Sequence, residues 1–388
     1  MTAQENLGLA FPVAEYRERL RTVQAGMEER GLEAALIFGA ENLFHLTGYE
    51  SIGYSSFQLA LVPAGGEPRL LVRELERPSA ERGTWMGGSV PSVEDGQDPI
   101  DALVELLRTS GLAGARLGVD RTSSILTVAE YLELAARLPE AELADGSGLV
   151  ERARRIKSPL ELDHIRQAAR YTEAGMRAGI DAIHEGALDN EAAAEAARAI
   201  YRAGSEYMTI APIVTSGARS GIAHTTFRRT RIDAGDAVLL EIGAVHRRYT
   251  GPLMRSAVVG RPGDEIRRMY DACSQGLDAA IAAIRPGAIA GDVHDACQRV
   301  IDEAGFTALF RKRLGYSVGV GFAPDWGEGH IVHLSHGDPT PLEPGMVFHM
   351  PPALRQDAVA GVGCSETVAV TEEGVEVLTS FPRPLAVR

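Results

Sequence analysis

The chain has 388 residues, 45% of them hydrophobic and 24% charged, which is typical of a globular protein long enough for two domains. Its formal net charge of −14 argues against nucleic acid or an anionic membrane surface as the main partner. No apolar run approaches the roughly 20 residues that span a bilayer, and acids stand where an export signal carries basic residues. The cysteines are few and widely spaced, so we predict a cytoplasmic protein without a disulfide framework.

The amino-terminal part of the chain predicts an α/β domain. Apolar residues recur at helical spacing between residues 14 and 31, and Ala34–Phe38 has the length and composition of a buried strand. Helical and strand-like segments then alternate, a pattern typical of α/β folds. Further strands are predicted at 59–63, 69–72, 116–119 and near 142, and further helices at 101–110 and 127–138.

A domain boundary is predicted near residue 155. The basic connector Arg152–Lys157 is followed by Ser158, Pro159 and Glu161, which suit the N-cap and first turn of a helix. The remaining residues alternate helices with short, glycine-punctuated strands and predict an α+β domain. Its helices are expected from 159, at 190–203, 264–284 and 289–304, and its strands at 316–322, 346–350 and 363–370.

The segment Asp236–Ser256 presents a single acid between two apolar runs. Residues 237–240 form an apolar strand that leads to Glu241. A carboxylate at a strand end is ordinarily solvated or paired, here with Arg247 or Arg248. Because the apolar pattern continues beyond the acid, desolvation would instead tune it for chemistry, and we favour this functional interpretation.

Six segments spread over both parts of the chain share a pattern: NLFHLTGYES, RIKSPLELDHIRQAA, IVTSGARSGIAHTTF, GDAVLLEIGA, LEPGMVFHMPP and CSETVAVTEEGVEVLT. Together they resemble the creatinase, prolidase and methionine-aminopeptidase superfamily, which has the pita-bread fold. The resemblance covers nearly the whole chain. It implies a creatinase-like amino-terminal α/β domain over residues 1–155 and a pita-bread catalytic domain over residues 156–388.

The metallopeptidases of this superfamily hold two metal ions with two Asp, one His and two Glu. The resemblance places these five ligands at Glu241, Pro252, Tyr316, Pro351 and Ser365, and only the first of these keeps a carboxylate. Divalent ions need several oxygen or nitrogen ligands, and proline side chains supply none. Even if the last ligand falls on the neighbouring glutamate, two ligands do not make a dinuclear centre. We expect a site without metal or other cofactor.

The superfamily includes metal-free members, creatinase and ectoine hydrolase, which cleave C–N bonds in small zwitterions. The segments EIGAVHRRYTGPLMRS, GYSVGVGFAPDWGE and LEPGMVFHM resemble ectoine hydrolase. The resemblance therefore implies a metal-independent hydrolase that cleaves a C–N bond of a small polar amidine or guanidine compound. Two alternatives are an Xaa-Pro dipeptidase or aminopeptidase, which the lost ligands disfavour, and a catalytically inactive pita-bread module that binds peptides or partners.

Such chemistry needs a nucleophile or activated water and an acid for the departing nitrogen. His224 lies where the family keeps its catalytic histidine, and its ordinary pKa suits proton transfer. Glu241 is expected to act as nucleophile or base. Glu366 is expected to pair with a substrate amidinium or guanidinium, or else to bond to backbone.

Substrate contacts are predicted at several other residues, each with a structural alternative. Tyr316 replaces a metal ligand and either fills the vacated space or donates a hydrogen bond. The side chain of a strand residue, such as His349, faces either inward or outward. Trp326 either covers a cationic ligand or packs in the core. The remaining predicted contacts are Asp325, beside that tryptophan, and Arg219 and Arg255, as candidates for a substrate carboxylate.

Two further features remain open at this level. In the family, the amino-terminal domain often caps the partner's active site, which implies a homodimer in which Phe44 and Tyr54 line the partner's pocket; an interdomain cluster is the alternative. The histidines His330, His333 and His336 are spaced as in some metal sites, but a glycine- and proline-rich loop gives them no common face, so we favour an exposed loop.

Overall fold

The structure, a computed structural model, describes residues 8–310 and 312–388. The chain divides into two compact units, Met1–Arg154 and Arg155–Arg388, one residue before the predicted boundary. The predicted fold class, an α/β domain followed by an α+β domain, is confirmed. Within the described ranges no helix is long and apolar enough to cross a membrane.

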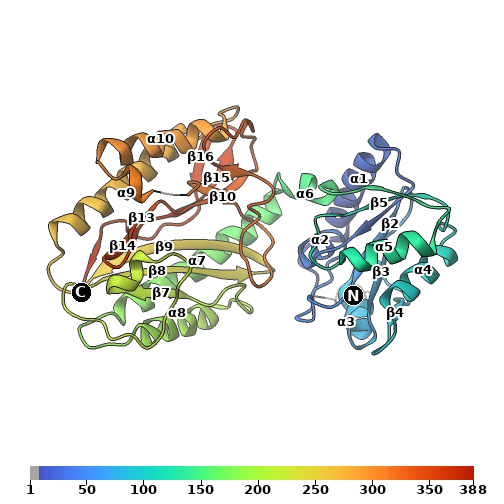
Figure 1. The fold of residues 1–388 in the computed structure, drawn as a ribbon, viewed down its shortest axis with the longest axis horizontal. Helices are drawn as coiled ribbons and strands as arrows, with labels where there is room; N and C mark the ends of the chain where they lie inside the picture. Colours follow the sequence, from blue (N-terminus) through green and yellow to red (C-terminus); the bar gives the residue numbers. More distant parts are fainter. Residues whose placement is uncertain (1–7, 311) are drawn as a thin grey trace. The chain divides into compact units, whose positions relative to one another are not determined.

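Unit 1 is built on a six-stranded mixed sheet with helices around it (Figure 1). The central strand β1 (Ala34–Ile37) pairs in parallel with β5 (Arg116–Val119) and antiparallel with β2 (Leu59–Pro63), and all four of its residues are buried. The other elements are α1 (Val13–Glu29), α2 (Ala40–Thr47), β3 (Arg69–Arg73), α3 (Arg77–Gly83), β4 (Ser92–Val93), α4 (Pro99–Thr109), α5 (Val128–Arg137), β6 (Glu142–Asp145) and α6 (Leu149–Arg154).

The sequence did not predict α2. Seven of its eight residues, including Asn42 and His45, are buried. Its eight residues make only about two turns, which is too short for a helical period to be told from a short apolar run in the sequence.

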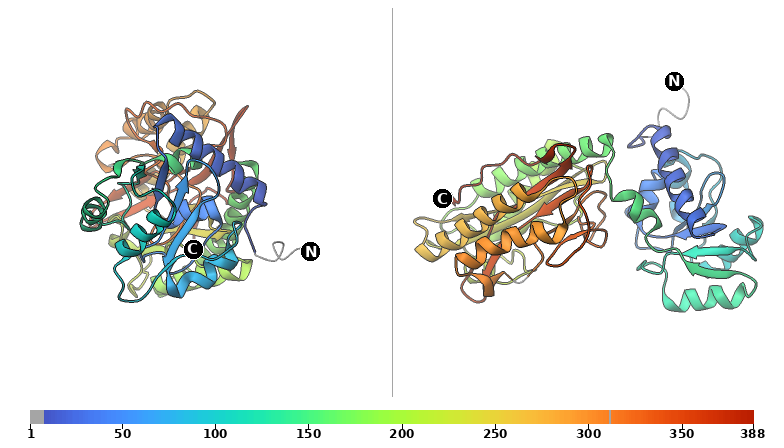
Figure 2. Two further views of the ribbon diagram at one scale, coloured as in Figure 1. Left: turned by 90° about the vertical axis from the view of Figure 1, so that its right-hand side faces the viewer. Right: turned by 90° about the horizontal axis from the view of Figure 1, so that it is seen from above.

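Unit 2 contains a four-stranded sheet, a five-stranded sheet and a hairpin. Two long antiparallel strands, β8 (Ala237–His246) and β9 (Tyr249–Val258), form its centre, and α7 (Pro159–Asp181) and α8 (Asp189–Ala203) pack against one face (Figure 1). Helices α9 (Asp264–Ala283) and α10 (Ala290–Glu303) lie side by side and enclose a second core (Figure 2). The remaining strands are β7 (Ile213–Ser216), β10 (Gly315–Ser317), β11 (His333–Leu334), β12 (Val347–Met350), β13 (Ala353–Gln356), β14 (Ala360–Gly363), β15 (Glu366–Thr371), β16 (Gly374–Val377) and β17 (Ala386–Val387).

Helix α7 begins as its sequence predicts. The Ser158 hydroxyl accepts a hydrogen bond from the Glu161 amide, and the Glu161 carboxylate accepts one from the Ser158 amide. This capping box satisfies amides that the helix itself leaves unpaired.

The two-residue turn between β8 and β9 has unusual residues. Arg247 and Arg248 have φ values of 49° and 65°, which a tight hairpin turn of this length requires and which Asn-Gly adopts more readily. The Arg248 side chain is fully buried, with its guanidinium carbon 3.9 Å from the Tyr207 ring and 4.5 Å from the Phe322 ring. This stacking offsets the backbone strain, since cation–π contacts are worth about 2 kcal/mol when desolvated.

The expected strand at 316–322 is shorter than predicted and ends at Ser317. Beyond it, the Val320 amide donates to the Glu328 carboxylate at 3.1 Å rather than to a neighbouring strand. Glu328 itself forms a buried ion pair with Lys157, with 2.7 Å between Nζ and Oε2. The segment after Ser317 keeps only isolated backbone pairings: the Val318 amide donates to the Val347 carbonyl at 3.1 Å and the Gly319 carbonyl accepts from the Thr250 amide at 3.0 Å.

Candidate active site

A pocket of about 630 Å³ opens in unit 2. Its wall is made by the loop after β7, by one residue of β8, by the segment that precedes β10, by Tyr316 and by the β13 hairpin. The lining residues are Gly221, Ile222, Ala223, His224, Glu241, Leu309, Lys312, Arg313, Tyr316, Pro351, Ala353, Arg355 and Asp357. Three of the predicted site residues, His224, Glu241 and Tyr316, therefore share one cavity.

Glu241 lies in the middle of strand β8 rather than at its end. It pairs with Ile213 of β7 and Met254 of β9, and its strand neighbours Leu240 and Ile242 are fully buried. Glu241 is only partly buried because its side chain faces the pocket. A regular sheet thus holds one carboxylate at the pocket wall with little freedom to move.

His224 has a strained backbone. Its φ is 57°, in the left-handed region that residues other than glycine rarely adopt. Thr225 Oγ1 donates to the Ile222 carbonyl at 3.0 Å and Arg219 Nη2 donates to the Thr226 carbonyl at 2.7 Å, so both close the loop around His224. Such strain costs on the order of 1–3 kcal/mol and occurs preferentially at functional sites. Arg219 itself supports this loop and is not part of the pocket wall.

Three basic residues that the sequence analysis did not select also line the pocket. The Lys312 side chain is exposed at the pocket. The protein atoms around its ammonium group still displace enough water to lower the Lys312 pKa, and the negative charge of Glu241 acts in the opposite direction. Burial likewise lowers the pKa of Arg355, which donates to the Ser220 carbonyl at 2.9 Å. Arg313 donates to His333 Nδ1 at 2.7 Å. The basic run at 311–313 was the sequence signal, since such runs are uncommon in this acidic chain.

Tyr316 is held from behind by two other predicted residues. Trp326 Nε1 donates to Tyr316 Oη at 2.9 Å, and His349 Nδ1 lies 3.0 Å from the same oxygen. Burial and the nearby Glu241 raise the pKa of Tyr316, so its hydroxyl stays protonated at neutral pH. Burial, together with Lys312, lowers the pKa of His349 well below its usual value, so the imidazole is neutral. Trp326 and His349 are buried and do not line the pocket.

Glu366 and Arg255 are both buried and pair with each other. The distance from Arg255 Nη2 to Glu366 Oε1 is 2.7 Å, and Arg383 Nε donates to the same oxygen at 2.8 Å. Thr379 donates to the other carboxylate oxygen. We therefore withdraw the predicted substrate contacts of Glu366 and Arg255, because each group already neutralises the other.

The remaining predicted residues lie away from this pocket wall. Asp325 is exposed, and its carboxylate accepts from the Gly327 amide at 2.9 Å. In unit 1, Phe44 is buried in α2, where it is unavailable to a partner subunit, and Tyr54 is partly buried. The prediction that Tyr54 reaches a partner's pocket stays a prediction.

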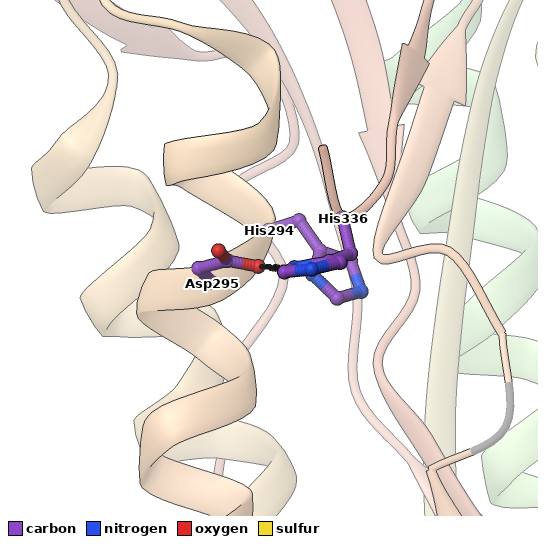
Figure 3. A group of neighbouring side chains, drawn as sticks. All are labelled: His294, Asp295 and His336. Carbon is purple, nitrogen blue, oxygen red and sulfur yellow. Dashed lines mark hydrogen bonds and ion pairs between the residues drawn. The ribbon is translucent and has the colours of Figure 1, made fainter. Parts of the chain in front are cut away.

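Among the described residues, the pocket wall has no group of three side chains with metal-ligand geometry. Pro252 pairs with Gly243 inside the β8–β9 ladder, and Pro351 lines the wall with a side chain that offers no ligand atom. In the described parts of the chain, the one group of three side chains with metal-ligand geometry is His294, Asp295 and His336 (Figure 3). It joins α10 to the loop after β11, and none of its members lines the pocket.

Hydrogen bonds account for this remote cluster. Asp295 Oδ1 lies 3.0 Å from His294 Nδ1 and 2.9 Å from His336 Nδ1 (Figure 3). Of the three loop histidines, only His336 joins it; His330 is exposed and His333 pairs with Arg313. The three histidines therefore form no common site.

Comparison with known proteins identifies the family. Residues 163–372 match "Metallopeptidase family M24" and residues 19–156 match "Creatinase/Prolidase N-terminal domain". The chain belongs to this family, with both domains in the order that the sequence predicted, and it is a hydrolase by membership.

Relatives with different reactions resemble it along their full length. The ectoine hydrolase of Halomonas elongata is 30% identical, with 98% of this chain and 99% of that protein covered. The Xaa-Pro dipeptidase of Pyrococcus furiosus is 27% identical, with 95% and 99% covered. Among solved structures, the dipeptidase PepE of Mycobacterium ulcerans is similar with a TM-score of 0.84 and 25% identity, over 97% of this chain and 99% of that one.

Proposed function

We propose that the protein is a metal-independent hydrolase that cleaves a C–N bond of a small polar amidine or guanidine compound. The observation that carries the proposal is the composition of the pocket wall: Glu241 and His224 line the cavity together with Tyr316 and Pro351, two residues that the family resemblance aligns with metal ligands. Resemblance to an ectoine hydrolase along the whole chain supports it.

The pocket residues can carry out such a hydrolysis in either of two ways. As a base, Glu241 takes a proton from water while the water oxygen bonds to the sp² carbon; as a nucleophile, its carboxylate oxygen bonds to that carbon first and water later releases the product. In both, the C–N bond breaks and its electron pair stays on nitrogen. His224 then supplies the proton that the departing nitrogen takes up.

The charge of the wall suits a small zwitterion. Lys312, Arg313 and Arg355 oppose only two pocket carboxylates, Glu241 and Asp357. A substrate with its own carboxylate would bind to the basic residues and place its cationic C–N centre toward Glu241. This arrangement would align the carbon with the attacking oxygen.

The test is hydrolysis by chelator-treated protein of a panel comprising ectoine, creatine, related cyclic amidines and an Xaa-Pro dipeptide, read by mass spectrometry. We expect one amidine or guanidine compound to gain one water, with no dependence on added metal. Cleavage of the dipeptide alone, and only after manganese is restored, would overturn the proposal and favour the dipeptidase function that resemblance to the Pyrococcus furiosus enzyme suggests.

We also propose that the protein is a homodimer. Unit 1 exposes two large aliphatic side chains, Ile52 with 80% and Leu75 with 70% of its surface accessible. Ile52 lies two positions from the partly buried Tyr54 in the sequence. Exposed aliphatic side chains such as these are suited to a contact with a second copy of the chain.

A further inference from the structure

Five groups behind the pocket form a continuous chain of hydrogen bonds. Trp326 Nε1 donates to Tyr316 Oη at 2.9 Å, and Tyr316 Oη lies 3.0 Å from His349 Nδ1. His349 Nε2 lies 2.8 Å from Ser365 Oγ, which accepts from the Met254 amide at 2.6 Å. The two ends of the chain are therefore fixed donors, an indole N–H and a backbone N–H.

The serine decides which histidine nitrogen carries the proton. Ser365 is fully buried, and among the described residues its hydroxyl proton has no acceptor within reach except His349 Nε2. A buried donor without an acceptor costs about 1–3 kcal/mol. His349 Nε2 therefore accepts from Ser365, and because the imidazole is neutral, its proton is on Nδ1.

The histidine in turn decides where the tyrosine proton points. With its proton on Nδ1, His349 donates to Tyr316 Oη, which already accepts from Trp326. Neither neighbour can then accept from Tyr316. The Tyr316 O–H bond must therefore point away from these hydrogen bonds and into the pocket that Tyr316 lines with Glu241.

Close packing fixes the ring in this orientation. A methyl group at Gly327 would lie 3.0 Å from the Tyr316 ring carbons, and one at Gly243 would lie 3.0 Å from Trp326. A side chain at either position would push the tyrosine or the indole out of its place by a few tenths of an ångström. The ring cannot swing away without losing both hydrogen bonds.

We propose that Tyr316 is a catalytic hydrogen-bond donor to the reacting C–N centre, and that His349 and Ser365 are positioning residues that aim its proton into the pocket. The catalytic role of Tyr316 rests on the proposed function, because that function supplies the substrate. The positions of the protons on His349 and Tyr316 do not depend on it. Tyr316 would donate to the oxygen or nitrogen on which charge develops as the nucleophile adds. The raised pKa of Tyr316 suits a donor that keeps its proton rather than one that transfers it.

The proton arrangement is tested without substrate. We would label the histidines with ¹⁵N and record ring-nitrogen shifts of the full-length protein, assigning His349 by its absence in His349→Gln. The expected result is a neutral ring with the proton on Nδ1. A proton on Nε2 would overturn the proposal whatever the enzyme acts on. In Ser365→Ala the preference for Nδ1 should be lost.

The catalytic role is tested on the compound that the panel identifies. Tyr316→Phe should lower kcat by about 100-fold and leave KM little changed, because other enzymes lose about this much when one hydrogen-bond donor to a developing charge is removed. Tyr270→Phe is the matched control, because its buried hydroxyl donates to the Arg383 carbonyl away from the pocket; it should keep the wild-type kcat. A kcat within twofold of wild type in Tyr316→Phe would overturn the proposal.

A double-mutant cycle separates positioning from general support of the fold. Ser365→Ala alone should lower kcat by about tenfold, and in the Tyr316→Phe background it should have no further effect on kcat. Multiplicative losses would show that Ser365 does not act through Tyr316. If no panel compound is hydrolysed, the proposed function fails and so does the catalytic role of Tyr316, while the histidine spectra still decide the proton arrangement.

Discussion

At the scale of single residues, the site depends on a few side chains that the backbone holds in place. Glu241 is fixed by a strand that is paired on both sides, and His224 by a strained loop. These two residues come from segments about 17 positions apart and meet at one cavity. Their juxtaposition makes hydrolytic chemistry possible there.

Removing either group should abolish turnover while leaving the fold intact. Glu241→Gln and His224→Ala should each lower kcat by at least about 100-fold, the usual contribution of a positioned acid or base. Steady-state kinetics and circular dichroism of the two variants check this. Asp357→Asn removes the other pocket carboxylate and serves as the control. Wild-type rates in Glu241→Gln or His224→Ala would remove that residue from its proposed role.

The His336–Asp295 contact should depend on pH. The hydrogen bond and charge of Asp295 raise the pKa of His336 above its ordinary value of 6.5. The contact therefore stabilises the fold fully below pH 6.5 and loses this effect as the pH rises through the folded-state pKa. An NMR titration should show the raised pKa, and Asp295→Asn should return it to the ordinary value. An unchanged His336 pKa in that variant would contradict the assignment.

At the scale of elements, a buried charge pair anchors the segment that carries Trp326. Lys157, just before α7, contacts Glu328 with both side chains almost fully buried. The Glu328 carboxylate also accepts from the Val320 amide. The residue before α7, the segment after β10 and the loop at 324–328 are thus joined by one carboxylate.

Breaking this pair should be costly. Lys157→Met leaves the Glu328 carboxylate buried without its ammonium partner, which should lower the free energy of unfolding by about 3–5 kcal/mol. Arg198→Met breaks the exposed pair with Glu195 on α8 and should cost no more than about 0.5 kcal/mol. Urea denaturation of both variants makes the comparison. Equal losses would mean that the buried pair contributes no more than a surface pair.

At the scale of the whole molecule, the chain keeps the family fold, and the loss of metal ligands belongs to the proposed function. Both domains match their family profiles, and the resemblance alone aligns Pro252 and Pro351 with metal ligands of the family's metallopeptidases. The sheets and helices do not depend on those ligands, since their cores are built from apolar residues. One architecture can therefore support different hydrolytic chemistries.

Self-association is the prediction at this scale. Light scattering after size-exclusion chromatography should give twice the mass of one chain. Replacing Ile52 and Leu75 together by lysine should yield monomers, because two charges would be buried at the contact. Leu132→Lys, which alters a leucine on α5 with 62% of its surface accessible, should leave the dimer unchanged. A monomeric wild-type protein would refute the proposed dimer.

The sequence by itself determined the order of the domains, most helices and strands, and the pairing of Glu241 with His224 as candidate catalytic groups. Capping residues and apolar periods are local signals, so Ser158 and Glu161 mark the start of α7 without any tertiary information. Elements whose partners are distant were missed or mispredicted. α2 has only eight residues, too few for a helical period to be told from a short apolar run, and the regular strand predicted at 316–322 ends at Ser317, beyond which only isolated pairings to β12 and β9 remain.

Only the tertiary structure decided which charged residues are free to act. Arg255 and Glu366 are candidates in sequence, but they are 111 positions apart and pair with each other inside the protein. Arg355 was not singled out because nothing local distinguishes it from a surface basic residue, and the basic run at 311–313 marks Lys312 without saying what it faces; the fold places both at the pocket. Sequence periodicity reports which face of an element is apolar, whereas the pairing of polar groups depends on contacts between segments far apart in the chain.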